Sequence, residues 1–80
     1  MPLEDKEARL RVMREIAKFN VDTTRLDVKL INSVVYMGGR ISRIRAPGAP
    51  DNLRKVLEEM EEIIRGMPGV NDLVMEVAID

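Results

Sequence analysis

The sequence lacks the two residue types that most often carry catalytic or metal chemistry. It contains no cysteine, which excludes disulfides, a thiol nucleophile and a zinc–thiolate site. It contains no histidine, which removes the commonest general base and the commonest metal ligand. The carboxylates follow patterns typical of solvated surfaces, and none has the D-x-D-x-D-G spacing of a calcium loop. The sequence therefore predicts no catalytic residue, no metal site and no cofactor.

Long apolar runs are also missing. No stretch approaches the roughly 20 apolar residues that a membrane span needs, and residues 1–19 lack the apolar core of a signal peptide. The 13 basic and 14 acidic residues nearly cancel, so no net field draws the protein to nucleic acid or membrane. The 80 residues predict one small domain. We expect a cytoplasmic protein if the sequence is complete, and a periplasmic or membrane-associated one if it is an excised domain.

Two segments have the apolar periodicity of amphipathic helices. In residues 4–18 a broad apolar arc includes Leu10 and Met13. In residues 51–66 the spacing i, i+3, i+4, i+7 repeats without a miss, and a helix is expected to begin near Pro50 or Asp51. The second stripe consists of Leu53, Val56, Leu57, Met60, Ile63, Ile64 and Met67.

Three other segments alternate between apolar and polar residues, which is typical of half-buried strands. They are residues 25–31, 34–42 and 72–79, and the first two are joined by the short turn Asn32-Ser33. The predicted fold class is α+β, a two-layer αββαβ sandwich with two helices on one face of a three-stranded mixed sheet. The second and third strands run parallel because a helix connects them, but the sequence leaves open which strand the third one pairs with.

The glycine pair Gly38-Gly39 interrupts the second predicted strand. The alternation places Gly39 on the helix-facing side with Val35 and Met37, where a missing side chain would let a helix approach the sheet closely. Gly38 falls on the opposite side, where nothing demands a glycine. A phosphate-binding loop is not expected, since such loops place glycines between a strand and a helix.

The segments "LDVKLINSVVYMGGRI" and "MPGVNDLVMEVAI", separated by one amphipathic helix, resemble the BON (bacterial OsmY and nodulation) domain family. The matching positions are Val34, Val35, Met37, Gly39 and Ile41 in the second strand, and Pro68, Gly69 and Val70 in the later turn. The chain departs from that pattern at Ser33, where a glycine is usual, and in the proline-rich loop "RIRAPGAPDN". The resemblance covers residues 25 to 79.

The resemblance implies a non-catalytic binding module of the kind found in membrane-associated proteins, where phospholipid membranes are the associated surface. A self-assembling unit similar to the ring-building domains of secretion systems is the alternative, and a small-ligand or ion-binding accessory domain is another.

A basic segment offers one candidate site. It consists of Arg40, Arg43, Arg45, Arg54 and Lys55, with only Asp51 opposing. Each cation near an anionic lipid surface contributes about 1 kcal/mol, so salt-sensitive membrane binding is one interpretation. The competing and favoured interpretation is a solvated rim, with Arg54–Glu58 and Lys55–Glu59 as i,i+4 ion pairs. Nucleic acid is not an expected partner, because no aromatic residues interleave with these cations.

The sheet face turned away from the helices offers a second candidate site. It is expected to carry the apolar residues Ile31, Val34, Tyr36, Val74 and Ala78 among charged ones. Single exposed apolar residues are normal, but a contiguous group marks a contact surface. The sequence therefore predicts a homo-oligomer or a protein partner that packs on this face, with Tyr36 at its centre.

Overall fold

The computed structural model describes residues 3–80, with side chains described from residue 6 onward. The elements in chain order are α1 (Leu3–Ala17), β1 (Leu26–Ile31), β2 (Val34–Ile41), α2 (Leu53–Arg65) and β3 (Asp72–Ile79). β2 lies in the middle of the three-stranded sheet, antiparallel to β1 and parallel to β3. The predicted α+β class with a mixed sheet is confirmed, and the third strand pairs with the second.

The hairpin between β1 and β2 is a two-residue turn whose residues both lie in the left-handed region. Asn32 has φ 50° and Ser33 has φ 65°, as a type I′ turn requires. This turn sets Ile31 opposite Val34 and fixes the register of the whole pair. Ser33 thus adopts a conformation that glycine would take without strain.

Helix α2 begins two residues later than the sequence suggested. The Asn52 side chain accepts a hydrogen bond from the Lys55 backbone N–H at 3.2 Å, so Asn52 is the N-cap and Leu53 the first helical residue. The expected start near Pro50 or Asp51 is therefore wrong. Pro50 and Asp51 are also favourable in a loop, and they precede the helix because Asn52 caps it.

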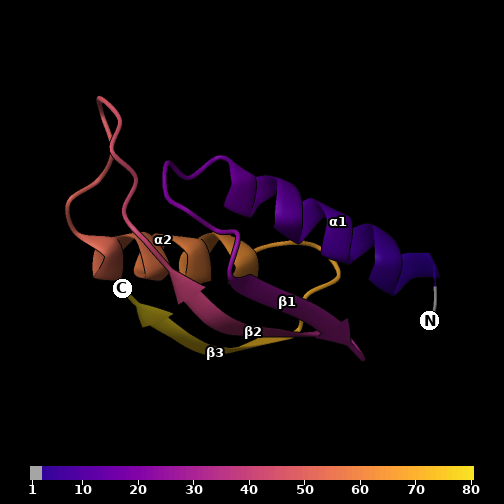
Figure 1. Ribbon diagram of the computed structural model, residues 1–80. Helices are drawn as coiled ribbons and strands as arrows, with labels where there is room; N and C mark the ends of the chain where they lie inside the picture. Colours follow the sequence, from indigo (N-terminus) through magenta and orange to yellow (C-terminus); the bar gives the residue numbers. More distant parts are fainter. Residues whose placement is uncertain (1–2) are drawn as a thin grey trace.

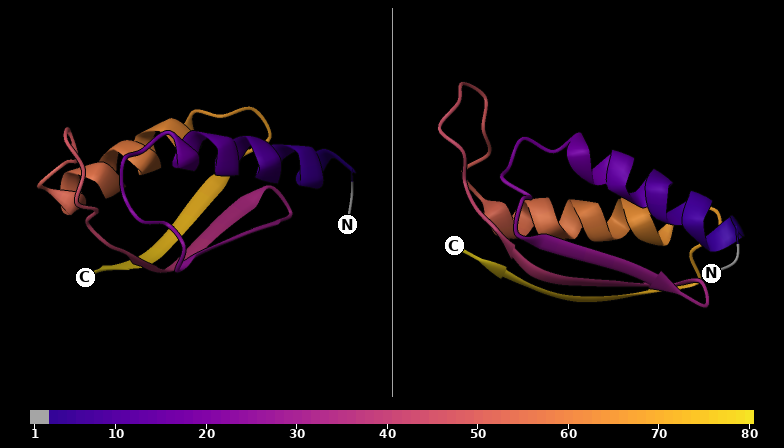
Figure 2. Two further views of the ribbon diagram at one scale, coloured as in Figure 1. Left: turned by 45° about the horizontal axis from the view of Figure 1, so that its top comes forward. Right: turned by 45° about the vertical axis from the view of Figure 1, so that its right-hand side comes forward.

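Both helices lie on the same side of the sheet, as Figures 1 and 2 show. The core lies between the two layers and consists of residues from all five elements and the α1–β1 loop: Ala8, Val12, Ile16, Val21, Val28, Leu30, Val35, Met37, Ile41, Leu53, Val56, Met60, Ile64 and Leu73. Helix α1 contributes a narrower stripe than its sequence predicts, because Leu10 and Met13 remain exposed. Among residues 6–17 of α1, the buried side chains are those of Ala8, Val12 and Ile16, which lie four positions apart on one side of the helix.

Gly39 does not serve the helix packing that its alternation pattern suggested, and it is exposed. Its φ is +87°, and a Cβ atom at this position would collide with the backbone carbonyl oxygen of Arg25, just before β1. The glycine is therefore required by the neighbouring strand's backbone and by its own left-handed conformation, not by a helix. At Gly38, in contrast, an added Cβ would meet nothing within 4 Å.

Candidate functional site

The face of the sheet opposite the helices, called the open face below, is built from four rows of residues that run across the strands. From the hairpin outward, they are Ile31–Val34–Asp72, Lys29–Tyr36–Val74, Asp27–Gly38–Glu76 and Arg25–Arg40–Ala78. The alternation of the strands places these residues on one face, while their neighbours point into the core. Tyr36 therefore lies in the central strand, between Lys29 and Val74.

The apolar end of the open face lies near the hairpin. Ile31 is 53% exposed, Tyr36 42% and Val74 39%, which makes them three of the largest exposed apolar side chains. Val34 beside them is half-buried, and Ala78 is exposed at the other end of β3. Of the five apolar residues that the sequence predicts on this face, four are thus exposed and Val34 is half-buried. Four of them form adjacent rows, while Ala78 is separated from them by the row that holds Gly38.

A shallow hollow lies between the apolar and charged ends of the open face. It has a volume of about 320 Å³, and its lining includes Tyr36, Gly38 and Val74 together with the charged residues Asp27, Lys29 and Glu76. Because Gly38 has no side chain, the backbone of the central strand is accessible at its floor. The Lys29 ammonium lies 3.9 Å from the Asp27 carboxylate, so part of the charge around the hollow is compensated.

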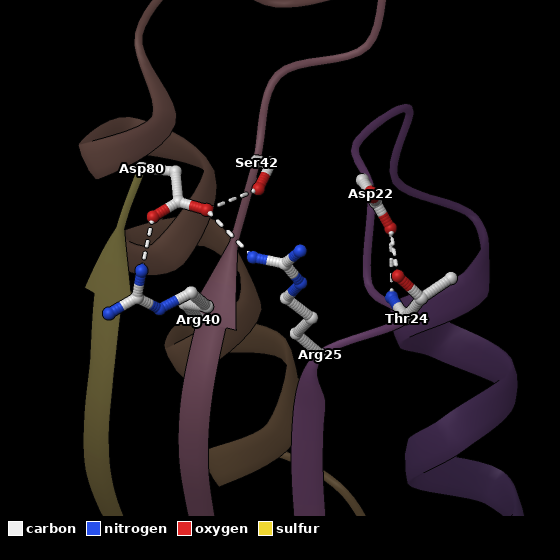
Figure 3. A network of polar contacts seen from close by, with 6 residues as sticks. All are labelled: Asp22, Thr24, Arg25, Arg40, Ser42 and Asp80. Atoms are coloured by element: carbon white, nitrogen blue, oxygen red, sulfur yellow. Dashed lines mark hydrogen bonds and ion pairs between the residues drawn. The ribbon is translucent and has the colours of Figure 1, made fainter.

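A network of ionic contacts closes the charged end of the open face, and Figure 3 shows it around Asp80. The carboxylate of Asp80 accepts hydrogen bonds from Arg40 Nη1 at 2.7 Å and from Ser42 Oγ at 2.9 Å. Arg25 Nη1 lies 3.8 Å from the same carboxylate. The network links the ends of β2 and β3 to the segment before β1, and the Asp80 carboxylate offsets part of the positive charge of Arg25 and Arg40, whose side chains remain exposed.

The five residues of the basic segment do not form one surface. Arg40 lies in β2 on the open face, where it pairs with Asp80. Arg43 donates from Nη2 to the backbone oxygen of Asp51 at 2.8 Å and so fastens the loop between β2 and α2. The other three residues, Arg45, Arg54 and Lys55, form no ion pair with any residue between 6 and 80. The predicted ion pairs Arg54–Glu58 and Lys55–Glu59 are therefore not formed.

A second ionic cluster lies where α2 meets the start of β3. Arg65 donates to Glu61 Oε1 and to Asp72 Oδ1, both at 3.0 Å, and to the backbone oxygen of Leu73 at 3.1 Å. These bonds to Glu61 and Asp72 raise the pKa of Arg65 above its usual value. The Leu73 N–H, followed by Arg65, holds the pKa of Asp72 below its usual range.

A further pKa shift within residues 6–80 belongs to Asp22, in the turn before β1. Its carboxylate accepts hydrogen bonds from the Thr24 hydroxyl at 2.7 Å and the Thr24 N–H at 2.9 Å, which hold the pKa of Asp22 below its usual range. Each of these shifts favours the charged form at neutral pH. No polar or charged side chain among residues 6–80 is buried. The hydrogen bonds that cause these pKa shifts hold turns and the ends of strands in place. None of the three shifts brings a pKa toward neutrality, as acid–base catalysis favours.

Sequence reasoning missed the partners that organise these clusters. Asp80, Ser42 and Arg65 had no periodic signal of their own, because each is an exposed polar residue near the end of an element. Asp80 and Arg40 are 40 positions apart in the sequence, and only the parallel register of β2 and β3 brings them together.

The described part of the chain adds two negative observations. No helix within residues 3–80 combines the length and apolarity needed to cross a membrane. No group of acidic side chains within the described residues has the arrangement of a metal site. Comparisons with protein-family models, with curated proteins and with solved structures find no significant match to this chain.

Proposed function

We propose that the protein is a non-catalytic association module whose open face packs against the same face of a second copy or against a protein partner. The observation that carries the proposal is the group formed by Ile31, Tyr36 and Val74, which remains exposed on the layer that no helix covers (Figure 1). Apolar groups of this kind mark contact surfaces. A two-fold arrangement is the simplest cover, because it uses one patch twice.

Two further features support a binding role over catalysis. The chain has neither histidine nor cysteine, and the resolved pKa shifts all stabilise charged side chains. The αββαβ order and the turn residues resemble the BON family, which implies a binding module. The hollow around Gly38 gives such a module a recess into which a partner's side chain can fit, with charged groups at its margin.

The test is the mass of the protein in solution, measured by multi-angle light scattering at high micromolar concentration. We expect an oligomer for the unmodified chain and a species of lower mass for Tyr36→Glu, because the substitution would bury an unpaired charge among apolar side chains. Leu10→Glu is the matched control, since Leu10 is equally exposed but lies on α1. Dissociation by Leu10→Glu with no effect of Tyr36→Glu would move the interface to the helical layer, and a monomeric unmodified chain would rule out self-association through the open face.

Association with an anionic lipid surface is a second candidate. It is favoured by one observation: Arg45, Arg54 and Lys55 are exposed and lack ion-pair partners among the residues whose side chains are described. At about 1 kcal/mol for each cation near such a surface, the three together would give only weak binding.

A further inference from the structure

The outer edge of β3 presents unpaired backbone groups. β3 lies at one margin of the sheet, and the Asp80 N–H donates to the Ile41 carbonyl at 3.0 Å. In a parallel pair, this bond directs the backbone of even-numbered β3 residues toward β2. The odd-numbered residues therefore direct their N–H and C=O groups outward, where a further strand can bind them.

The first part of this edge is closed by side chains, but the rest is open. The Leu73 N–H donates to Asp72 Oδ1 at 2.8 Å, and the Leu73 carbonyl accepts a hydrogen bond from Arg65. For Met75, Val77 and Ile79, the outward groups have no hydrogen-bond partner within residues 3–80. The open part of the edge thus spans three successive outward-facing residues.

Strand β3 lacks the residues that usually prevent an exposed sheet edge from pairing with another strand. The strand contains no lysine, arginine or proline, and its one charge beyond Asp72 is Glu76. The edge of β1 differs, because Arg9 Nε donates to its Val28 carbonyl at 3.3 Å. The side chains along the β3 edge are also apolar, and Ile79 is 42% exposed despite facing the helical layer.

We propose that β3 pairs antiparallel with β3 of a second copy, with Val77 of one chain opposite Val77 of the other. Met75 then lies opposite Ile79 of the second copy, and the reciprocal pair forms on the other side of the two-fold axis. Each of these three pairs exchanges two hydrogen bonds, about six in all, so every open group of the edge is satisfied. The edge thus binds a partner of its own kind, an extended and mostly apolar strand with few charged side chains.

The charges on β3 select this register over its neighbours. With Val77 on the axis, Glu76 lies opposite Ala78 of the second copy. A shift of the axis to Glu76 would set the two Glu76 carboxylates directly opposite each other, which destabilises a strand pair. A shift to Met75 would require the backbone groups of Leu73, which are already bound by Asp72 and Arg65.

The consequence is a continuous six-stranded sheet in the order β1-β2-β3-β3-β2-β1. Both open faces then lie on the same side of the sheet, because strand pairing keeps the pleat continuous. The apolar ends around Tyr36 stay exposed and are doubled in number. This inference concerns the edge of the sheet and does not depend on the function proposed for its open face.

Disulfide trapping tests both the pairing and its register, since the chain contains no cysteine of its own. The two single variants Glu76→Cys and Ala78→Cys are mixed, and the rate of disulfide formation between them is measured. The control is Glu59→Cys, on the exposed face of α2, which gives the rate of cross-linking by random collision. Positions 76 and 78 of two copies form a non-hydrogen-bonded pair with Cα atoms about 4.5 Å apart, within disulfide range. We expect rapid cross-links in the mixture and only the control rate for each variant alone. Rapid cross-linking of Glu76→Cys alone, or control rates throughout, would overturn the proposed pairing.

Amide hydrogen exchange measured by NMR gives an independent readout. The amides of Met75, Val77 and Ile79 should become protected as the protein concentration rises, while even-numbered β3 amides are protected at every concentration. The same gain is expected in Tyr36→Glu, because the edge does not use the open face. Concentration-independent exchange at these three amides would overturn the edge pairing. The light-scattering result for the open face would remain a separate outcome.

Discussion

Gly39 is the position where a single added methyl group should be most harmful. The substitution Gly39→Ala places a Cβ atom against the Arg25 carbonyl oxygen, with the Asp27 backbone nitrogen 3.3 Å away. These neighbours are strand backbone, so they cannot move aside as a flexible side chain would. The residue must also keep a φ of +87°, which L-amino acids rarely adopt.

The size of the effect follows from these two contributions. A non-glycine residue held in a sparsely populated backbone region costs about 1–3 kcal/mol. Overpacking against atoms that cannot relax costs about 1–3 kcal/mol more. We therefore expect Gly39→Ala to lower the free energy of unfolding by about 2–6 kcal/mol, a large part of the roughly 5–15 kcal/mol typical of a small domain.

Gly38→Ala is the matched control, one residue away in the same strand. An added Cβ there meets nothing within 4 Å, and alanine reduces the entropy lost on folding, so the change should be neutral or stabilising by up to about 1 kcal/mol. Urea unfolding followed by far-ultraviolet circular dichroism suits a chain without tryptophan. Equal unfolding free energies for the two variants, or a Gly39→Ala loss below about 0.5 kcal/mol, would refute the role assigned to the Arg25 carbonyl.

Three further outcomes are expected. Ser33→Gly should raise the free energy of unfolding by about 0.5–1 kcal/mol, because glycine relieves the left-handed strain at the turn at some entropic cost, and a loss of stability would contradict this. Stability should decline as the pH falls below about 4, since Asp22 and Asp72 have folded pKa values below their unfolded ones: their contribution is present above the unfolded pKa and is lost as the pH falls through the folded one. Asp72→Asn should flatten this acid decline in urea unfolding series, and an unchanged decline would place its origin elsewhere. Co-sedimentation with vesicles should require anionic lipid, fade with salt and be lost in Arg45→Glu plus Arg54→Glu, whereas equal binding to neutral vesicles would exclude the electrostatic interpretation.

Local periodicity was sufficient to predict the class of the fold and the identity of each element. In α2 the apolar spacing matches one face of a helix, and Leu53, Val56, Met60 and Ile64 are indeed buried. In the strands the alternation separates core from solvent, which places Tyr36 and Val74 on the open face. These features could be predicted because burial on one side of a regular element repeats with the period of that element.

The arrangement of the elements and the reasons for particular residues were decided only by the tertiary structure. Alternation assigned Gly39 to the helix-facing side, but Gly39 is exposed and has a left-handed φ, and the atom that excludes a side chain belongs to a residue 14 positions earlier. Likewise, no local pattern predicts that Arg40 binds Asp80, or that β3 lies at the edge of the sheet with part of its backbone unpaired. Such features depend on strand order and register, which are set by contacts between residues distant in the sequence, and a periodic pattern contains no information about them.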